Sequence, residues 1–333
     1  MADIDLPDEL RDALRAAWHR YVDLLAPLRP SLHGYCRRLT GNVWDAEDLA
    51  QETLLRAFAT LGSVHVPIEN PRAYLLRTAT NAWVDVVRRR GTEATALADP
   101  SALPASADAP TDAVRDAGTV LLQRLAPQER AAVVLKELFE YSLDEIAAIL
   151  GTTVGAVKAA LHRGRTRLRE PEAQTTRRRP LPSVALVDHF VAAYADADLP
   201  ALLALMLDTG SVENVGSSVD VGRAAFGRDR GWFWHLVNGH PEWPAEFAYE
   251  AARLERREVD GEPVALGFAT RRGREGLEQV LRFQEDDGRI ARIRGYSFCP
   301  ETMREVGTML GLRVRTGLYR FPTPAPGKTW EGA

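Results

Sequence analysis

Apolar residues recur at helical spacing through the first ninety residues of the chain. In one series, steps of three and four residues separate Leu10, Leu14, Trp18, Tyr21 and Leu25. Such steps place side chains on one face of an α-helix, where they can pack against neighbouring helices. The pattern predicts a helical domain over residues 7–90.

The helical pattern stops at residues 91–113, which read GTEATALADPSALPASADAPTDA. This stretch contains four acids and no aromatic residue, and Ala, Pro, Ser and Asp dominate it. Such a composition cannot bury a core, so we expect an extended linker. Helical spacing returns over residues 114–170, and a second short linker is expected over residues 171–182.

Strand signals first appear beyond residue 183. The pairs Asp260-Gly261 and Asp287-Gly288 are typical of tight hairpin turns, because both residue types tolerate positive φ angles. In chain order, we expect helices over 183–196 and 199–207, a Gly-rich stretch, a helix near 222–237, strands near 263–270, 278–285 and 289–298, and a helix over 300–311. Helices followed by an antiparallel sheet predict an α+β domain over residues 183–312, with a tail over residues 313–333. The chain is therefore expected to be multidomain, with all-α parts followed by an α+β part.

Composition and charge narrow the class of protein. Of the 333 residues, 45% are hydrophobic and 26% are charged, as in soluble globular proteins. No window approaches eighteen consecutive apolar residues, and the acidic N-terminus lacks a secretion signal, so we expect a cytoplasmic protein without a membrane span. The two cysteines, Cys36 and Cys299, lie in different predicted domains, which argues against a disulfide framework.

A local charge asymmetry points to an anionic partner. The net charge is −4, yet residues 151–179 hold eight basic and two acidic residues. A basic stripe in a mildly acidic protein favours one anionic contact site over general binding to polyanions.

The segment 142–169, SLDEIAAILGTTVGAVKAALHRGRTRLR, predicts a helix-turn-helix. Ser142 and Glu145 have the spacing of a capping box, and Gly151 supplies the tight turn between the two helices. The outward face of the second helix carries Lys158, Ala159, His162, Arg163 and Arg165. A helix with Lys and Arg on one face fits the major groove of DNA. The alternative is a basic amphipathic hairpin without a role in DNA binding.

The second helix resembles region 4 of extracytoplasmic-function (ECF) sigma factors, a subfamily of the sigma-70 factors of RNA polymerase. That family carries a pattern close to GTVKSRLHRAR, and residues 155–165 here read GAVKAALHRGR. The resemblance implies that Lys158, His162 and Arg163 read the −35 promoter element, and that region 4 meets the β flap of the polymerase. Ala159 and Ala160 replace the usual Ser and Arg, which removes polar contacts and predicts either an altered base preference at −35 or weaker binding.

Residues 45–58, DAEDLAQETLLRAF, form an acidic helix that is similar to sigma region 2.2. On composition alone these acids would be a solvated helix face that favours the helix dipole. The resemblance instead implies docking on the clamp helices of the polymerase β′ subunit. The contacting residues would be Asp45, Asp48, Gln51 and Glu52.

Residues 70–90, NPRAYLLRTATNAWVDVVRRR, resemble sigma regions 2.3 and 2.4. The resemblance implies that the loop over residues 63–70 holds a flipped base of the −10 element, which costs a few kcal/mol of unstacking. The residues expected to contact −10 DNA are Asn70, Arg77, Asn81, Arg88, Arg89 and Arg90. For Trp83 the core interpretation is favoured over stacking on a base. The acidic linker would occupy the channel that later takes RNA.

The C-terminal part resembles the NTF2-like, SnoaL-like cone fold, which some ECF sigma factors carry as a fusion that regulates them in cis. The linker and cone motifs of some such fusions, WLPEP and DGGGR, are absent, so any docking contacts must differ. Cones of this kind enclose a pocket that can take a small ligand, and aromatic residues are the expected lining. The candidates are Trp232, Trp234, Trp243, Phe247, Tyr249, Phe268, Phe283, Tyr296 and Phe298.

Catalytic candidates in the cone are Asp220, His235 and His240, and nothing in the sequence pairs them. We therefore expect no enzyme, no cofactor and no metal site. The favoured function is a sigma factor that binds core RNA polymerase and promoter DNA, with no membrane partner. Two alternatives stay open: a helix-turn-helix regulator that never binds the core, and a bifunctional protein whose cone senses a ligand or is catalytic.

Overall fold

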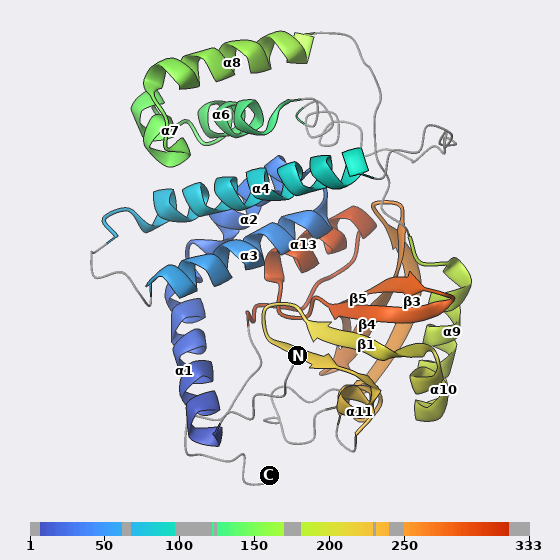
Figure 1. Cartoon of the computed structure of the whole chain (residues 1–333). Helices are drawn as coiled ribbons and strands as arrows, with labels where there is room; N and C mark the ends of the chain where they lie inside the picture. The colour runs from blue at the N-terminus through green and yellow to red at the C-terminus, as the bar shows by residue number, and fades with distance from the viewer. Residues whose placement is uncertain are drawn as a thin grey trace. The chain divides into compact units, whose positions relative to one another are not determined.

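The computed structural model describes residues 7–61, 68–96, 122, 125–169, 181–228, 231–239 and 250–319. Over these residues the chain forms twelve helices and six strands (Figure 1). They group into two compact units: residues 24–176 form one, and residues 1–23 with residues 177–333 form the other. The all-α and α+β parts expected from the sequence are both present.

Four helices cover the first predicted domain: α1 (Asp8–Leu25), α2 (Arg29–Thr40), α3 (Val43–Leu61) and α4 (Pro71–Ala96). The expectation that the linker begins at residue 91 is wrong, because α4 continues through Ala96. Residues 92–96 are Thr, Glu and Ala, and a single glycine in a helix costs only about 1 kcal/mol. Residues 97–113 of the predicted linker, and residues 114–121 of the helical part predicted after it, lie outside the described part of the chain.

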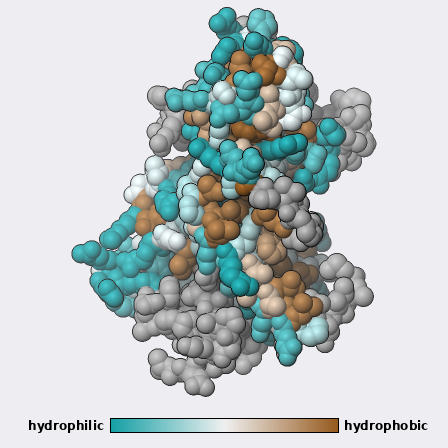
Figure 2. Space-filling model, turned by 90° about the vertical axis from the view of Figure 1, so that its left-hand side faces the viewer, coloured by the Kyte–Doolittle hydropathy of each residue, from teal (hydrophilic) through white to brown (hydrophobic). Residues whose placement is uncertain are grey.

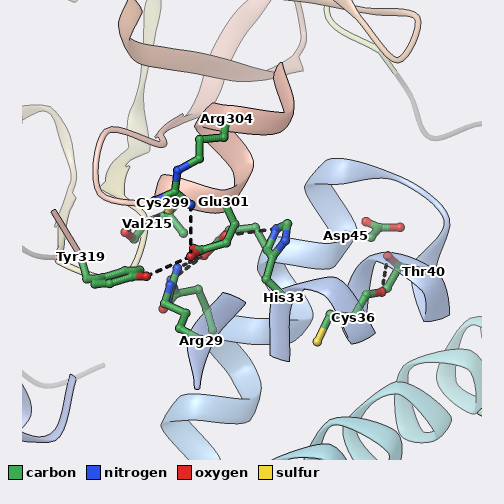
Figure 3. Close-up of polar contacts among 12 residues, drawn as sticks. Arg29, His33, Cys36, Thr40, Asp45, Val215, Cys299, Glu301, Arg304 and Tyr319 are labelled. Atoms are coloured by element: carbon green, nitrogen blue, oxygen red, sulfur yellow. Dashed lines mark hydrogen bonds and ion pairs between the residues drawn. The ribbon is translucent and has the colours of Figure 1, made fainter. Parts of the chain in front are cut away.

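Helices α2, α3 and α4 share one core. Tyr35, Leu39, Ala46, Ala50 and Leu76 are all at most 1% exposed. Helix α2 ends where Gly41 takes a φ of 89°, which allows α3 to start two residues later. In the last turn of α2, the hydroxyl of Thr40 donates to the carbonyl of Cys36 at 2.9 Å (Figure 3).

The helix-turn-helix consists of α7 (Leu143–Leu150) and α8 (Val154–Arg169), preceded by α6 (Pro127–Glu137). The capping box expected from the sequence is confirmed: Glu145 N donates to Ser142 Oγ at 3.2 Å, and Ser142 N donates to Glu145 Oε2 at 2.7 Å. Gly151 ends α7 with a φ of 61°. Helices α6 and α8 approach closely, because a Cβ on Gly164 would lie 2.9 Å from Val133 Cγ2.

The second unit contains a six-stranded sheet in the order β2-β1-β6-β5-β4-β3. Its strands are β1 (Met206–Asn214), β2 (Ser218–Val221), β3 (Ala251–Val259), β4 (Glu262–Arg271), β5 (Arg274–Asp286) and β6 (Arg289–Gly295). The expected antiparallel sheet is corrected to a mixed one, because β1 runs parallel to β6 while every other pair is antiparallel. Strand β6 lies between β1 and β5 in the sheet, and it forms after β3, β4 and β5 along the chain.

Both Asp-Gly hairpin turns are confirmed, with positive φ angles at Asp260-Gly261 and at Asp287-Gly288. A third turn of the same kind, Arg272-Gly273, joins β4 to β5. The sequence did not predict it, because Arg rarely takes a positive φ. The Gly-rich stretch, for which no element was predicted, forms β1 and β2. The single helix expected near 222–237 is wrong, because two short helices lie there, α11 (Arg223–Phe226) and α12 (Trp232–Asn238).

Helices α9 (Val184–Ala195) and α10 (Leu199–Ala204) lie beside the sheet, and α13 (Pro300–Leu310) follows its last strand (Figure 1). The core between helices and sheet includes Phe190, Leu202, Phe226, Phe233 and Phe283. The start of the predicted tail is ordered along β5: Leu277 N donates to Arg313 O at 2.8 Å, and Arg315 N donates to Leu277 O at 2.9 Å. Tyr319 then donates to Glu301 Oε1 at 2.9 Å, beside Arg304 (Figure 3).

Candidate functional site

The outward face of α8 carries the side chains predicted to read DNA. Lys158, Ala159 and His162 are exposed, and the side chains of Lys158 and His162 make no hydrogen bond or ion pair with any residue in the described ranges. Ala160 is only 5% exposed, because it faces α6 and α7 with Val157 and Leu161. The expectation that both Ala159 and Ala160 remove polar DNA contacts is therefore corrected: only Ala159 lies on the accessible face.

The arginines of α8 are held by acids of α6. Glu129, whose side chain is 5% exposed, accepts from Arg163 Nε at 2.9 Å and from Arg167 at 2.7 Å. Arg165 lies 2.5 Å from the exposed Glu137. This role of Glu129 was not predicted, although its position three residues after Ala126 fits a helix start, and Ala126 N donates to it at 3.2 Å. These pairs fix the orientation of α8 on α6.

Helix α3 divides its acidic residues between the interior and the surface. Glu47 is fully buried, where it accepts from Arg29 at 2.5 Å and from Gln51 Nε2 at 2.7 Å, with His33 Nε2 at 3.6 Å. Gln51 is itself buried at 9% exposure. Of the four residues predicted to dock on the polymerase, Gln51 therefore lies on the buried side of the helix.

The other three predicted docking residues are more accessible. Asp45 and Asp48 are half-buried, and Asp45 is held by the amide of Asn42 at 3.0 Å. Glu52 pairs with Arg56 at 2.6 Å, and Arg56 also reaches Asp85 of α4 at 3.0 Å. Arg56 thereby links the acidic helix to α4.

Helix α4 presents the residues predicted to contact −10 DNA. Asn70 caps the helix, and its Oδ1 accepts from Ala73 N at 3.0 Å. Arg77, Asn81, Arg88 and Arg89 are exposed. The steps of four and seven residues between Arg77, Asn81 and Arg88 place these three on one face. The side chain of Arg90 and residues 63–67 of the predicted base-binding loop lie outside the described part of the chain.

Trp83 is buried, in agreement with the core interpretation. The guanidinium of Arg130, from α6, lies 4.8 Å from its ring centroid, and Arg130 donates to the carbonyl of Leu39 at 2.5 Å. Burial lowers the pKa of Arg130 to about 10, so the side chain remains cationic at neutral pH. Burial also raises the pKa of the Cys36 thiol, which keeps it protonated and unreactive.

The C-terminal unit holds a cavity of about 840 Å³. Three of the predicted aromatic residues line it, namely Trp232, Phe268 and Phe298. Phe283 lies instead in the core between sheet and helices, Tyr296 is fully buried, and Trp234 does not line the cavity. Trp243, Phe247 and Tyr249 lie outside the described residues.

The catalytic candidates Asp220 and His235 both line this cavity, whereas His240 lies outside the described residues. Asp220 lies 3.6 Å from Arg228, and His235 Nδ1 lies 3.0 Å from the carbonyl of Gly239. Within the described ranges, no group of three or more His, Cys, Asp or Glu side chains is arranged to hold a metal ion.

Hydrophilic side chains alternate with apolar patches on the face drawn in Figure 2. Of the helices that the structure describes, none combines the length and the apolar character needed to cross a membrane.

Comparison with known proteins identifies both helical parts. The family model for sigma-70 region 2 matches residues 24–93, and that for sigma-70 region 4 matches residues 119–168. The ECF RNA polymerase sigma factor SigW of Bacillus subtilis is 32% identical over 166 residues, which cover 45% of this chain and 87% of SigW. The chain spans about three fifths of the length of two other ECF sigma factors that it matches.

The C-terminal part is shared with a further relative. The probable ECF sigma factor SigI of Mycobacterium tuberculosis is 27% identical over 296 residues, covering 85% of this chain and 92% of SigI. Among solved structures, an NTF-2-like protein of unknown function from Burkholderia xenovorans covers 43% of this chain at 13% identity with a TM-score of 0.24. The matched regions 2 and 4, and the extent of the match to SigW, lead to one conclusion: this chain belongs to the extracytoplasmic-function family of RNA polymerase sigma factors.

Proposed function

We propose that the protein binds core RNA polymerase and directs it to specific promoters, where it starts transcription in the cytoplasm. The observation that carries this proposal is the outward face of α8. Its Lys158 and His162 are exposed and unengaged, while acids of α6 hold Arg163, Arg165 and Arg167. A rigid helix with free polar side chains along one face suits readout of base edges in the major groove.

Docking on the polymerase is assigned to α3, with the β′ clamp helices as the partner surface and the β flap as the partner of the helix-turn-helix. The accessible acids Asp45, Asp48 and Glu52 support this role, whereas Gln51 would act through the buried Glu47 that it hydrogen-bonds. On α4, the exposed Arg77, Asn81, Arg88 and Arg89 would contact the −10 element. Contacts from arginines to phosphates would make promoter binding salt-dependent.

A run-off transcription assay with purified core polymerase tests the proposal. The protein should confer transcription from specific promoters, and Asp48→Ala should weaken core association. Asp286→Ala, at the exposed end of β5, is the matched control and should behave as wild type. A helix-turn-helix regulator that never binds the core would be unaffected by Asp48→Ala.

For the C-terminal unit we propose regulation of the sigma activity in cis, without chemistry of its own. Its cavity supports a second role, the binding of a small ligand. Transcription by a chain that ends at residue 175 tells whether the C-terminal unit inhibits or supports the sigma activity. Increased activity would mean that the C-terminal unit restrains the sigma part, lost activity would mean that it is required, and unchanged activity would contradict regulation.

A further inference from the structure

The cavity of the C-terminal unit has a floor that differs chemically from the neighbouring core. Four apolar residues of the sheet belong to that core, namely Val212, Ala265, Leu281 and Ile293. Residues two apart along a strand point to the same face. Two positions away from these four residues, on the same strands and the same face, lie Asn214, Gly267, Gln279 and Gly295. Asn214, Gly267 and Gln279 line the cavity. Over two residues of each strand, the side chains on this face of the sheet thus change from aliphatic groups to glycines and carboxamides.

Gly295 separates the two carboxamides. A Cβ on this residue would lie 3.1 Å from Asn214 Oδ1 and 3.6 Å from Gln279 Nε2. Asn214 and Gly295 are partners in the β1–β6 register, so the amide of Asn214 stands directly beside the glycine. Both amides therefore lie within 4 Å of one point above Gly295, with Leu281 Cδ2 at 3.4 Å from the same point, so a side chain at position 295 would crowd them.

Neither carboxamide is satisfied by the described residues. Asn214 is only 7% exposed, and no hydrogen bond joins its side chain, or that of Gln279, to any other residue in the ranges that the structure covers. Gln279 is partly exposed, whereas Asn214 is mostly buried, a setting in which amide groups normally have hydrogen-bond partners. An amide offers a donor NH₂ group and an acceptor oxygen, so a molecule in the cavity can meet both.

The lining favours an uncharged, flat molecule. Aromatic side chains of Tyr194, Trp232, Phe268 and Phe298 line the cavity. Charged groups of the lining are largely paired: Arg253 binds Glu275 through two contacts of 2.8 Å and lies 4.1 Å from the Phe268 ring centroid, and Arg271 binds Glu278 through two contacts of 2.7 Å. The volume of about 840 Å³ falls within the range of small-molecule sites.

We propose that this cavity binds a neutral, flat, mainly apolar small molecule that carries a hydrogen-bond donor and acceptor side by side, as in a lactam. Asn214 and Gln279 bind its polar edge, and Trp232 contacts an apolar face. The inference names the ligand class for the ligand-binding role proposed above and rests on that role. It does not depend on promoter recognition.

Three bicyclic probes of similar size separate the ligand classes by isothermal titration calorimetry with the full chain. 2-Quinolone is neutral and has the adjacent donor and acceptor, 2-methoxyquinoline is neutral but lacks the donor, and 2-naphthoate is an anion. We expect 2-quinolone to bind most tightly. Gln279→Met removes one amide at nearly constant volume and should weaken 2-quinolone binding by about two- to tenfold, as expected for one neutral hydrogen bond.

Gln284→Met is the matched control, because Gln284 is exposed on the same strand and does not line the cavity. It should leave the affinity unchanged, and Asn214→Leu should weaken binding as Gln279→Met does. The inference is overturned if 2-naphthoate binds more tightly than 2-quinolone, if Gln279→Met leaves 2-quinolone affinity unchanged, or if 2-quinolone does not bind at millimolar concentration. Run-off transcription with the same preparations reports the sigma activity separately, so a chain that transcribes but does not bind 2-quinolone overturns this inference alone.

Discussion

The buried carboxylate of Glu129 in α6 pairs with two arginines of α8, and the effect of replacing it by glutamine can be worked out from the structure. Glu129 accepts from Arg163 at 2.9 Å, from Arg167 at 2.7 Å and from Ala126 N at 3.2 Å. Glutamine keeps the shape and one carbonyl acceptor but loses the negative charge. Both arginines are about half exposed, so water can solvate them after the change.

The half-exposure of the two arginines sets the free energy that Glu129→Gln should cost. A hydrogen bond to a charged group contributes about 1.5–3 kcal/mol when it is buried, and an exposed ion pair contributes at most about 1 kcal/mol. For two pairs that are buried at one end only, we expect Glu129→Gln to cost about 1–2 kcal/mol. That free energy corresponds to a factor of about 5–30 in the local opening equilibrium.

Native-state hydrogen exchange of peptides from α6 and α8 measures this opening directly. Glu129→Gln should lower the protection of these amides by about 5–30-fold. The matched control is Glu137→Gln, because Glu137 pairs with Arg165 at 2.5 Å with both side chains about half exposed. It should lower protection by less than about fivefold. Equal effects of the two changes, or no effect of Glu129→Gln, would refute the argument that burial of this carboxylate organises the helices.

Three further predictions concern the helix-turn-helix. Ser142→Ala removes the cap of α7 and should destabilise this helix by about 1 kcal/mol. Hydrogen exchange in α7 peptides should then be faster, and unchanged exchange would contradict the capping role. Hydrogen bonds from Ser142 lower the pKa of Glu145, so the stability that this carboxylate contributes is present above its ordinary pKa and is lost as pH falls through the lowered value. An acid titration by circular dichroism should therefore show α7 losing stability at lower pH in the wild type, and Glu145→Gln should flatten this dependence. Lys158→Ala should weaken promoter binding, measured by fluorescence anisotropy. If Lys158 contacts a phosphate, the slope of log affinity against log salt concentration should also fall by about 1. An unchanged affinity would contradict the assignment of Lys158 to the DNA-binding face.

Local signals allowed much of the fold to be predicted. The capping box at Ser142 and Glu145, the turn glycine at 151 and the two Asp-Gly hairpins are each set by residues close together in sequence. Strands β1, β2 and β3 were missed: β2 and β3 are edge strands that pair with close neighbours in sequence, whereas the place of β1 in the sheet depends on a distant partner. β1 is placed by its parallel contact with β6, about eighty residues later.

The sequence predicted which segments form the candidate sites, but it did not predict which of their side chains are buried and which are exposed. Glu47 and Gln51 read as part of an exposed acidic face, yet Arg29 from the preceding helix draws Glu47 into the interior. Ala160 read as a missing DNA contact, yet it packs inside the helix-turn-helix. Such assignments depend on which neighbouring helix supplies the partner, and the periodicity of a single helix does not contain that information.

The central claim is that this chain carries core RNA polymerase to promoters through α3. The most direct measurement is run-off transcription with purified core polymerase, comparing the wild type with Asp48→Ala and with the control Asp286→Ala. We expect promoter-specific transcripts with the wild type and the control, and reduced transcripts with Asp48→Ala that recover as the concentration of that variant is raised. Transcription that does not depend on the added protein would contradict the proposed sigma function.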